Sequence, residues 1–256
     1  MTIKKIAVHG EQIACLFSDT NREPALLFLH GAGCTNEVWN AQWQYFKDRE
    51  RILIPSLPGH GDSSGRSYDT IDAYANIILE LTQKEHIDRF VLIGHSMGGA
   101  IAQHIALQNP ELLAALILVS TGARLRVAPQ VFSAIETDYR QYIELASNVS
   151  MFSSVNDRIR FNFKNILSHS PSRSAYNDFT ACDRFDVMNK IDNIKTKTLI
   201  LVGDRDIMTP PKYAIFLNQK INSSRLEIIK DAGHMVMMEK PEEVNKAIEN
   251  FLTPAQ

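Results

Sequence analysis

The sequence has few of the features that mark membrane-spanning or disulfide-rich proteins. No segment approaches the roughly 18 consecutive apolar residues of a transmembrane helix, and the start, MTIKKIAVHGEQIACLF, contains no apolar run of signal-peptide length. The three cysteines, Cys15, Cys34 and Cys182, are widely spaced and odd in number, which favours reduced thiols over a disulfide framework or a zinc site. These absences predict a cytoplasmic protein without a membrane span.

An excess of charge of one sign is also lacking. The chain has 27 Lys and Arg residues against 29 Asp and Glu residues, a formal charge of -2, and no basic block. The electrostatic footprint of a nucleic-acid-binding protein is therefore missing, and we expect no nucleic-acid partner. With 256 residues, 45% of them hydrophobic, the chain can form one sizeable globular core with an insertion.

Short segments rich in Val, Ile and Leu alternate with longer amphipathic segments along most of the chain. This alternation is typical of a mostly parallel sheet flanked by helices. We expect eight strands, at IKKIAVHG, QIACLF, ALLFLH, RILIPS, RFVLIG, AALILVS, TLILVG and RLEIIK, the first two forming an antiparallel hairpin. We expect helices at EVWNAQWQYFKD with Asn36 as N-cap, TIDAYANIILELTQKE, MGGAIAQHIALQN before Pro110, PPKYAIFLNQKI capped by Thr209, and PEEVNKAIENFL.

The interval of about 75 residues between AALILVS and TLILVG is too long for a loop. Its pattern predicts a helical cap over residues 123–190, inserted between strands 6 and 7 of a core formed by residues 1–122 and 191–256. One expected helix of this cap has an apolar face formed by Val131, Ile135, Tyr139, Tyr142, Ile143 and Ala146. A second has an apolar face formed by Ile159, Phe163, Ile166 and Leu167.

The segment RFVLIGHSMGGAIAQHIAL contains the most specific motif, G-x-S-x-G, from Gly94 to Gly98. The motif lies between an expected strand and an expected helix, which is the context of a nucleophile elbow. Ser96 must take a strained turn there so that its hydroxyl projects, and the two glycines remove side chains that would collide. We therefore predict that Ser96 is a catalytic nucleophile.

A serine hydroxyl needs a base that is itself held by an acid. Among the eight histidines, His234 in DAGHMVMMEKP is the best candidate base, because it follows an expected strand at the edge where parallel strands deliver active-site residues. The acid is expected in GDRDIMTP, after the preceding strand, where Asp204 and Asp206 are both available. His60 is interpreted as a turn residue between Gly59 and Gly61, since no partner with metal-ligand spacing lies near it in the sequence, and His95 as a packing or hydrogen-bonding residue beneath the elbow.

Four separate stretches, HGAG (30–33), LPGHGDSSG (57–65), GHSMGG (94–99) and GDRDIMTP (203–210), resemble motifs of the serine-type α/β-hydrolase family. The resemblance covers nearly the whole chain except the details of the cap. It implies the α/β-hydrolase fold and a carboxylesterase-like activity without cofactor or metal. In that family the acid commonly lies four residues before the proline, which implies Asp206 as the acid and leaves Asp204 a structural role.

The resemblance also implies an acyl-enzyme mechanism, in which His234 takes the proton of Ser96 and Asp206 holds the imidazole. The oxyanion would be met by the backbone N–H groups of Ala32 and Met97. We expect a small-molecule ester as substrate, and the sequence leaves the oligomeric state open between monomer and homodimer. The candidate substrate-binding residues are His30, Gly31, Tyr139, Phe163 and Met235.

Several other functions use this fold. Haloalkane dehalogenases and epoxide hydrolases have aspartate at the elbow, so Ser96 argues against both. Carbon-carbon bond hydrolases typically have asparagine where His95 stands and tryptophan where Met235 stands, which lowers that alternative without removing it. Thioesterases and a non-catalytic ligand-binding receptor also remain as alternatives.

Overall fold

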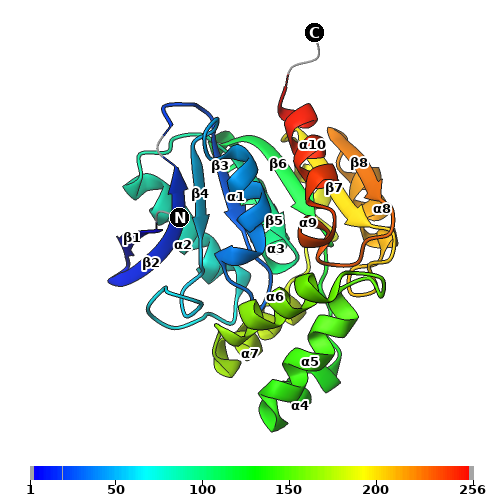
Figure 1. Cartoon of the computed structure of the whole chain (residues 1–256). Helices are drawn as coiled ribbons and strands as arrows, with labels where there is room; N and C mark the ends of the chain where they lie inside the picture. Colours follow the sequence, from blue (N-terminus) through cyan, green and yellow to red (C-terminus); the bar gives the residue numbers. More distant parts are fainter. Residues whose placement is uncertain (1–2, 19, 254–256) are drawn as a thin grey trace.

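An eight-stranded sheet forms the centre of the molecule (Figure 1). The computed structural model describes residues 3–18 and 20–253. The strands are β1 (Ile3–Val8), β2 (Glu11–Ser18), β3 (Ala25–Leu29), β4 (Ile52–Pro55), β5 (Phe90–His95), β6 (Leu113–Val119), β7 (Thr198–Gly203) and β8 (Ser224–Ile229). Their order is β1-β2-β4-β3-β5-β6-β7-β8, with β2 antiparallel to both its neighbours and the remaining pairs parallel. The predicted mostly parallel sheet is confirmed.

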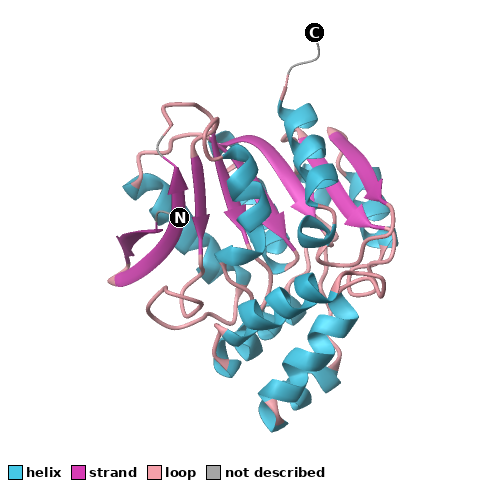
Figure 2. Cartoon of the chain, viewed as in Figure 1, coloured by secondary structure: helices cyan, strands magenta, loops and turns pink. Residues whose placement is uncertain are grey.

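The central strands are buried along their whole length because both faces of the sheet are covered. Every residue of β3, β4, β5 and β7 is buried, as expected for parallel strands between two helical layers. The edge strand β8 is only partly buried. The layers are visible in Figure 2, where helices lie on both sides of the strands.

Helices α1 (Asn40–Phe46), α9 (Val236–Glu239) and α10 (Pro241–Leu252) cover one face. Helices α2 (Ile71–Lys84), α3 (Met97–Gln108) and α8 (Pro211–Lys220) cover the other. Three short 3-10 helices, η1 (Asn36–Trp39), η2 (Pro110–Leu112) and η3 (Ile191–Asn193), complete the core. All five helices predicted for the core are present, and α9 was not anticipated.

Two predicted helix caps are wrong. Thr35, not Asn36, caps the first helical segment, because its hydroxyl accepts a hydrogen bond from the N–H of Glu37 and Asn36 is already helical. Thr209 does not cap α8, which begins at Pro211 without a side-chain cap. The Thr209 hydroxyl instead donates a hydrogen bond to Asp206.

Four helices lie between β6 and β7, beyond the carboxyl ends of the parallel strands (Figure 2). They are α4 (Pro129–Thr137), α5 (Tyr139–Ser150), α6 (Asp157–Ser168) and α7 (Ser172–Arg184), and we call them the insertion. The single helix expected from Val131 to Ala146 is wrong, because Asp138 is extended, ends α4 and caps α5 by accepting from the N–H of Gln141. Helix α7 was not anticipated.

None of the helices formed by residues 3–18 and 20–253 has the length and apolar character needed to cross a membrane.

Candidate active site

The site lies where four parallel strands end at the same edge of the sheet. Ser96 follows β5, Asp206 follows β7, His234 follows β8, and the loop of residues 30–34 follows β3. Parallel strands deliver their carboxyl ends to one edge, so residues 139 positions apart in the chain become neighbours: His95 Nε2 lies 3.0 Å from the carbonyl oxygen of His234. The topology alone therefore explains why these residues meet.

The turn at Ser96 is strained. Its backbone has φ 52° and ψ -114°, a conformation that residues with a side chain rarely adopt. A Cβ atom at Gly94 would lie 2.2 Å from the carbonyl oxygen of Gly98, and one at Gly98 would lie 2.4 Å from that of Leu29. The carbonyl oxygen of Ser96 is held by the hydroxyl of Thr121 at 2.8 Å. The two glycines are thus required by close backbone contact, and Ser96 sits at the start of α3.

Asp206 is in direct contact with His234. Oδ2 of the aspartate lies 2.9 Å from Nδ1 of the imidazole, and both side chains are almost fully buried. A carboxylate only accepts hydrogen bonds, so this contact requires a proton on Nδ1. The other aspartate of this loop, Asp204, instead faces Arg205 and the backbone N–H of Ala232.

The surroundings of Asp206 favour its charged form. Its Oδ1 accepts from the N–H groups of Met208 (2.9 Å) and Thr209 (2.8 Å), and its Oδ2 accepts from the Thr209 hydroxyl (2.8 Å). Burial by itself opposes ionisation, but the nearby His234 and these hydrogen bonds outweigh it and lower the pKa of Asp206. Thr209 also lies 3.1 Å from His234 Nδ1, so it contacts both partners. The residues around Thr209 in the sequence gave no sign of this double contact.

His95 is buried beneath the elbow. Its Nε2 donates to the carbonyl oxygen of His234, and burial, together with the neighbouring His234, holds the pKa of His95 well below the usual range. Its Nδ1 is buried without a hydrogen-bond partner among the described residues. This neutral ring packs 4.7 Å from that of His234, centroid to centroid, which agrees with the packing interpretation.

The loop after β3 lies against Ser96. A Cβ atom at Gly31 would approach Ser96 Cβ to 3.1 Å and His95 Nδ1 to 2.8 Å, so only glycine allows this approach. Ala32 and Gly31 line a cavity together with Ser96. His30 does not: its buried ring turns away, with Nε2 accepting from the N–H of Leu57 at 2.9 Å and Nδ1 donating to the carbonyl oxygen of Gly31.

That cavity is small and mostly apolar. It has a volume of about 30 Å³ and is reached by both Ser96 and His234. Its lining comprises Gly31, Ala32, Cys34, His95, Ser96, Tyr142, Ala146, Ser150, Phe163, Leu167, Phe179, Met208, His234 and Met235. Of the expected substrate-binding residues it includes Gly31, Phe163 and Met235, but neither His30 nor Tyr139. Tyr142, one turn along α5 from Tyr139, takes that place.

The loop that bears His234 is tied to the insertion. The carbonyl oxygen of Ser150, at the end of α5, accepts from the N–H groups of His234 (2.8 Å) and Met235 (3.2 Å). The Glu239 carboxylate accepts from the N–H groups of Gly233 (3.0 Å) and Phe152 (2.9 Å).

Within the described residues no group of three potential metal ligands is found.

Comparisons with known proteins agree with this architecture. A family model described as "Alpha/beta hydrolase family" matches residues 26–247. A solved thermophilic esterase is 32% identical, with a TM-score of 0.86, over 98% of this chain and 97% of that one. The enol-lactonase from Burkholderia xenovorans LB400 is 21% identical, with a TM-score of 0.91, over 98% and 100% of the two chains, which shows a shared fold.

Among curated proteins, a putative carbamate hydrolase from Rhizobium rhizogenes is 24% identical over 89% of this chain and 92% of its own. The relatives named here are all hydrolases, and the family model covers most of the sequence. The chain therefore belongs to the alpha/beta hydrolase family.

Proposed function

We propose that the protein is a serine hydrolase that cleaves small, uncharged carboxylic esters through an acyl-enzyme, with Ser96, His234 and Asp206 as its catalytic triad. The observation that carries the proposal is the buried 2.9 Å contact between Asp206 and His234 beside a strained serine at the elbow. A carboxylate that fixes the imidazole tautomer leaves Nε2 free to act as the base. The esterase and lactonase relatives support the same reaction class.

In the first half-reaction, His234 Nε2 takes the proton of the Ser96 hydroxyl while Oγ attacks the ester carbonyl carbon. The carbonyl electron pair moves onto oxygen, and the N–H groups of Ala32 and Met97 donate to this oxyanion. Collapse of the intermediate breaks the ester C–O bond, and the alcohol leaves with the proton held by His234. Water, deprotonated by His234, then cleaves the acyl-serine and releases the carboxylic acid.

The chemical character of the cavity supports an uncharged substrate. Its lining includes no Lys or Arg side chain, so an anionic acyl group has no cation to meet it there. Helices α5, α6 and α7 contribute aromatic and aliphatic side chains to its wall, which supports a role of the insertion as a cap over the acyl group. The cavity, about 30 Å³ in volume, leaves little room beside Ser96, so short acyl chains require the least displacement of the insertion.

The test is steady-state hydrolysis of p-nitrophenyl esters from acetate to dodecanoate, with a matching thioester series. We expect turnover to peak at the short esters and Ser96→Ala to lower kcat on the order of 10⁶-fold. The Ser96→Ala protein should unfold at the same denaturant concentration as the wild type, which serves as the control for folding.

Absence of turnover on every ester and thioester by a folded wild-type protein would refute the proposal. Carbon-carbon bond hydrolysis would then be the next activity to assay. Saturable thermal stabilisation by a ligand without turnover would instead indicate a receptor.

A further inference from the structure

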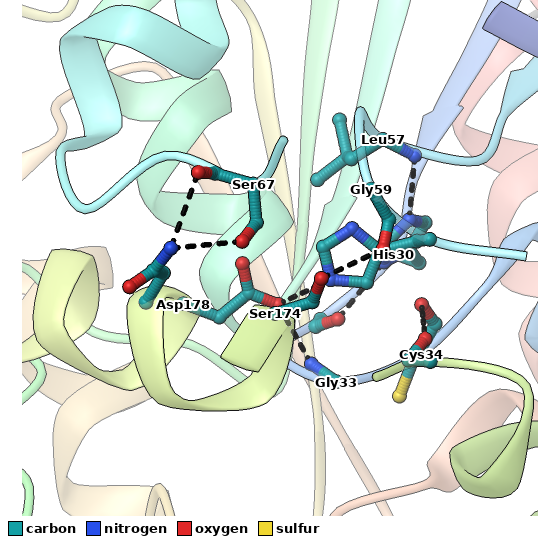
Figure 3. A network of polar contacts seen from close by, with 12 residues as sticks. His30, Gly33, Cys34, Leu57, Gly59, Ser67, Ser174 and Asp178 are labelled. Atoms are coloured by element: carbon teal, nitrogen blue, oxygen red, sulfur yellow. Dashed lines mark hydrogen bonds and ion pairs between the residues drawn. The ribbon is translucent and has the colours of Figure 1, made fainter. Parts of the chain in front are cut away.

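A buried carboxylate of the insertion contacts the loop that bears Ala32. Asp178, in the middle of α7, is completely buried, and its Oδ2 accepts from the backbone N–H of Gly33 at 2.8 Å (Figure 3). The same oxygen lies 2.8 Å from Nε2 of His60, and Oδ1 accepts from the hydroxyl of Tyr74. Asp178 therefore joins the insertion to three separate segments of the core.

His60 lies in the turn predicted for it, between Gly59 and Gly61, but its ring also has a buried carboxylate partner that the sequence did not indicate. Its ring is fully buried, and both nitrogens face oxygen atoms that can only accept: Nδ1 lies 3.0 Å from the carbonyl oxygen of Pro58, and Nε2 faces Asp178. Both nitrogens must therefore carry protons, so His60 is an imidazolium paired with the Asp178 carboxylate. Burial lowers its pKa, but the charge and hydrogen bond of Asp178 outweigh that effect and raise it.

The neighbouring histidine has the opposite state. His30, whose ring lies 5.2 Å from that of His60, accepts a hydrogen bond at Nε2 from Leu57. Burial and the neighbouring His60 lower the pKa of His30 to about 3, so it stays neutral. The positive charge of His60 thus faces the negative charge of Asp178, and the buried pair has no net charge.

Further contacts hold the same two loops to the insertion. The hydroxyl of Ser170 donates to the carbonyl oxygen of Cys34 (3.3 Å), and that of Ser174 donates to the carbonyl oxygen of Gly59 (2.7 Å) (Figure 3). Gly33 has φ +67°, so the loop takes a left-handed turn directly after Ala32. Asp178 holds the N–H of Gly33, the residue directly after Ala32.

We propose that Asp178 and His60 are positioning residues, a buried ion pair through which helix α7 holds the Gly31–Gly33 loop in the geometry of an oxyanion hole. The inference rests on the proposed function. A hydrogen-bond donor for the oxyanion acts only if it is aimed at the place where the negative charge develops. Loss of the pair lets the loop relax away from Ser96, which weakens binding of the transition state while the apolar cavity still binds the ester.

The experiment compares Asp178→Asn with Asp183→Asn, a matched control on the same helix whose carboxylate accepts from the N–H of Val127 and lies outside the loop contacts. Asparagine has the shape of aspartate. Its carbonyl oxygen can still accept hydrogen bonds from the Gly33 N–H and from His60. The neutral amide, however, no longer balances the positive charge of the imidazolium. With p-nitrophenyl acetate we expect Asp178→Asn to lower kcat about tenfold to a hundredfold at nearly constant KM, and Asp183→Asn to leave both unchanged.

A rescue variant separates positioning from general damage. In Asp178→Asn combined with His60→Gln, the glutamine amide donates to the asparagine carbonyl and restores an uncharged pair, so kcat should recover in part. In the wild type, ¹⁵N spectra of His60 should show protons on both ring nitrogens at pH 7, and the Gly33 amide should exchange more slowly than in Asp178→Asn.

Equal kcat values for Asp178→Asn and Asp183→Asn, or a His60 ring with a single proton, would overturn the inference. If Asp178→Asn does not fold, His60→Gln alone should still lower kcat at constant KM, and an unchanged kcat there would equally overturn it. A wild type without ester turnover would refute the proposed function, and the ring spectrum and Gly33 exchange would still decide whether the ion pair holds the loop.

Discussion

Asp206 and Asp204 are two residues apart, yet only Asp206 is placed to act on the imidazole. We expect Asp206→Asn to lower kcat roughly 10⁴-fold, because the asparagine amide would stabilise the wrong tautomer of His234. Asp204→Asn should have little effect on kcat, since its carboxylate faces Arg205. The two variants are compared by steady-state ester hydrolysis. A larger loss in a folded Asp204→Asn protein would contradict the assignment.

Thr209 supplies a hydroxyl to the same oxygen of Asp206 that faces His234. Thr209→Val removes this donor, and we expect it to lower the free energy of unfolding by about 1–3 kcal/mol at pH 7. The pKa of Asp206 is lower in the folded state than its value of 3.8 in the unfolded chain. The contacts of the charged carboxylate therefore stabilise the protein fully at pH values above 3.8, and this stabilisation is lost as the pH falls through the folded pKa.

The cost of Thr209→Val should therefore shrink in acid, when Asp206 is protonated. Urea unfolding of the variant and the wild type at several pH values measures this. Thr209→Ser keeps the hydroxyl and is the matched control. A cost that is the same at every pH would show that the hydroxyl does not act through the carboxylate.

At the scale of elements, α5 depends on the cap at Asp138. This helix supplies Tyr142 and Ala146 to the cavity wall and ends at Ser150, whose carbonyl holds the His234 loop. Asp138→Ala removes the acceptor for the Gln141 N–H and should lower the free energy of unfolding by about 1 kcal/mol. Asp138→Asn preserves the cap and should be nearly neutral. Denaturant unfolding of both variants tests this, and equal losses would contradict a capping role.

The elements of the core were predictable because their signals are local. Strands such as β3 and β5 are continuous apolar runs between turn residues, and α10 has a clear helical periodicity. The division of the insertion into α4 and α5 was missed, because the apolar positions on either side of Asp138 continue in register. Helix α7 was missed because the polar Asp178 lies on its buried side.

At the scale of the whole molecule, the His60–Asp178 pair links the insertion to the core and should make stability depend on pH. The pKa of His60 is raised in the folded state above its usual 6.5, so the stabilisation is complete below about pH 6.5 and is lost as the pH rises through the folded pKa. The other titratable groups near the pair are His30, Cys34, Tyr74, Tyr139, Tyr142 and Cys182.

None of these six groups changes charge in the folded protein near neutral pH. Burial raises the pKa values of both thiols and of the three tyrosines, and burial together with the nearby His60 lowers that of His30 to about 3. We therefore expect the free energy of unfolding of the wild type to fall more steeply than that of His60→Gln as the pH rises above about 6.5. Urea unfolding across this range is the measurement, and parallel curves would refute the prediction.

Local sequence alone determined the alternation of strands and helices, the elbow at Ser96, and the histidine that follows the last strand, because each depends on backbone conformation and apolar pattern within a short segment. The resemblance of GDRDIMTP to a family motif was needed to prefer Asp206 over Asp204. Only the tertiary structure brought Asp178 to His60, 118 residues away, and the Ser150 carbonyl to His234. The reason is physical: a buried charge is tolerated only where a partner compensates it. Here that partner lies far away in the chain, so the sequence next to either residue does not indicate the contact.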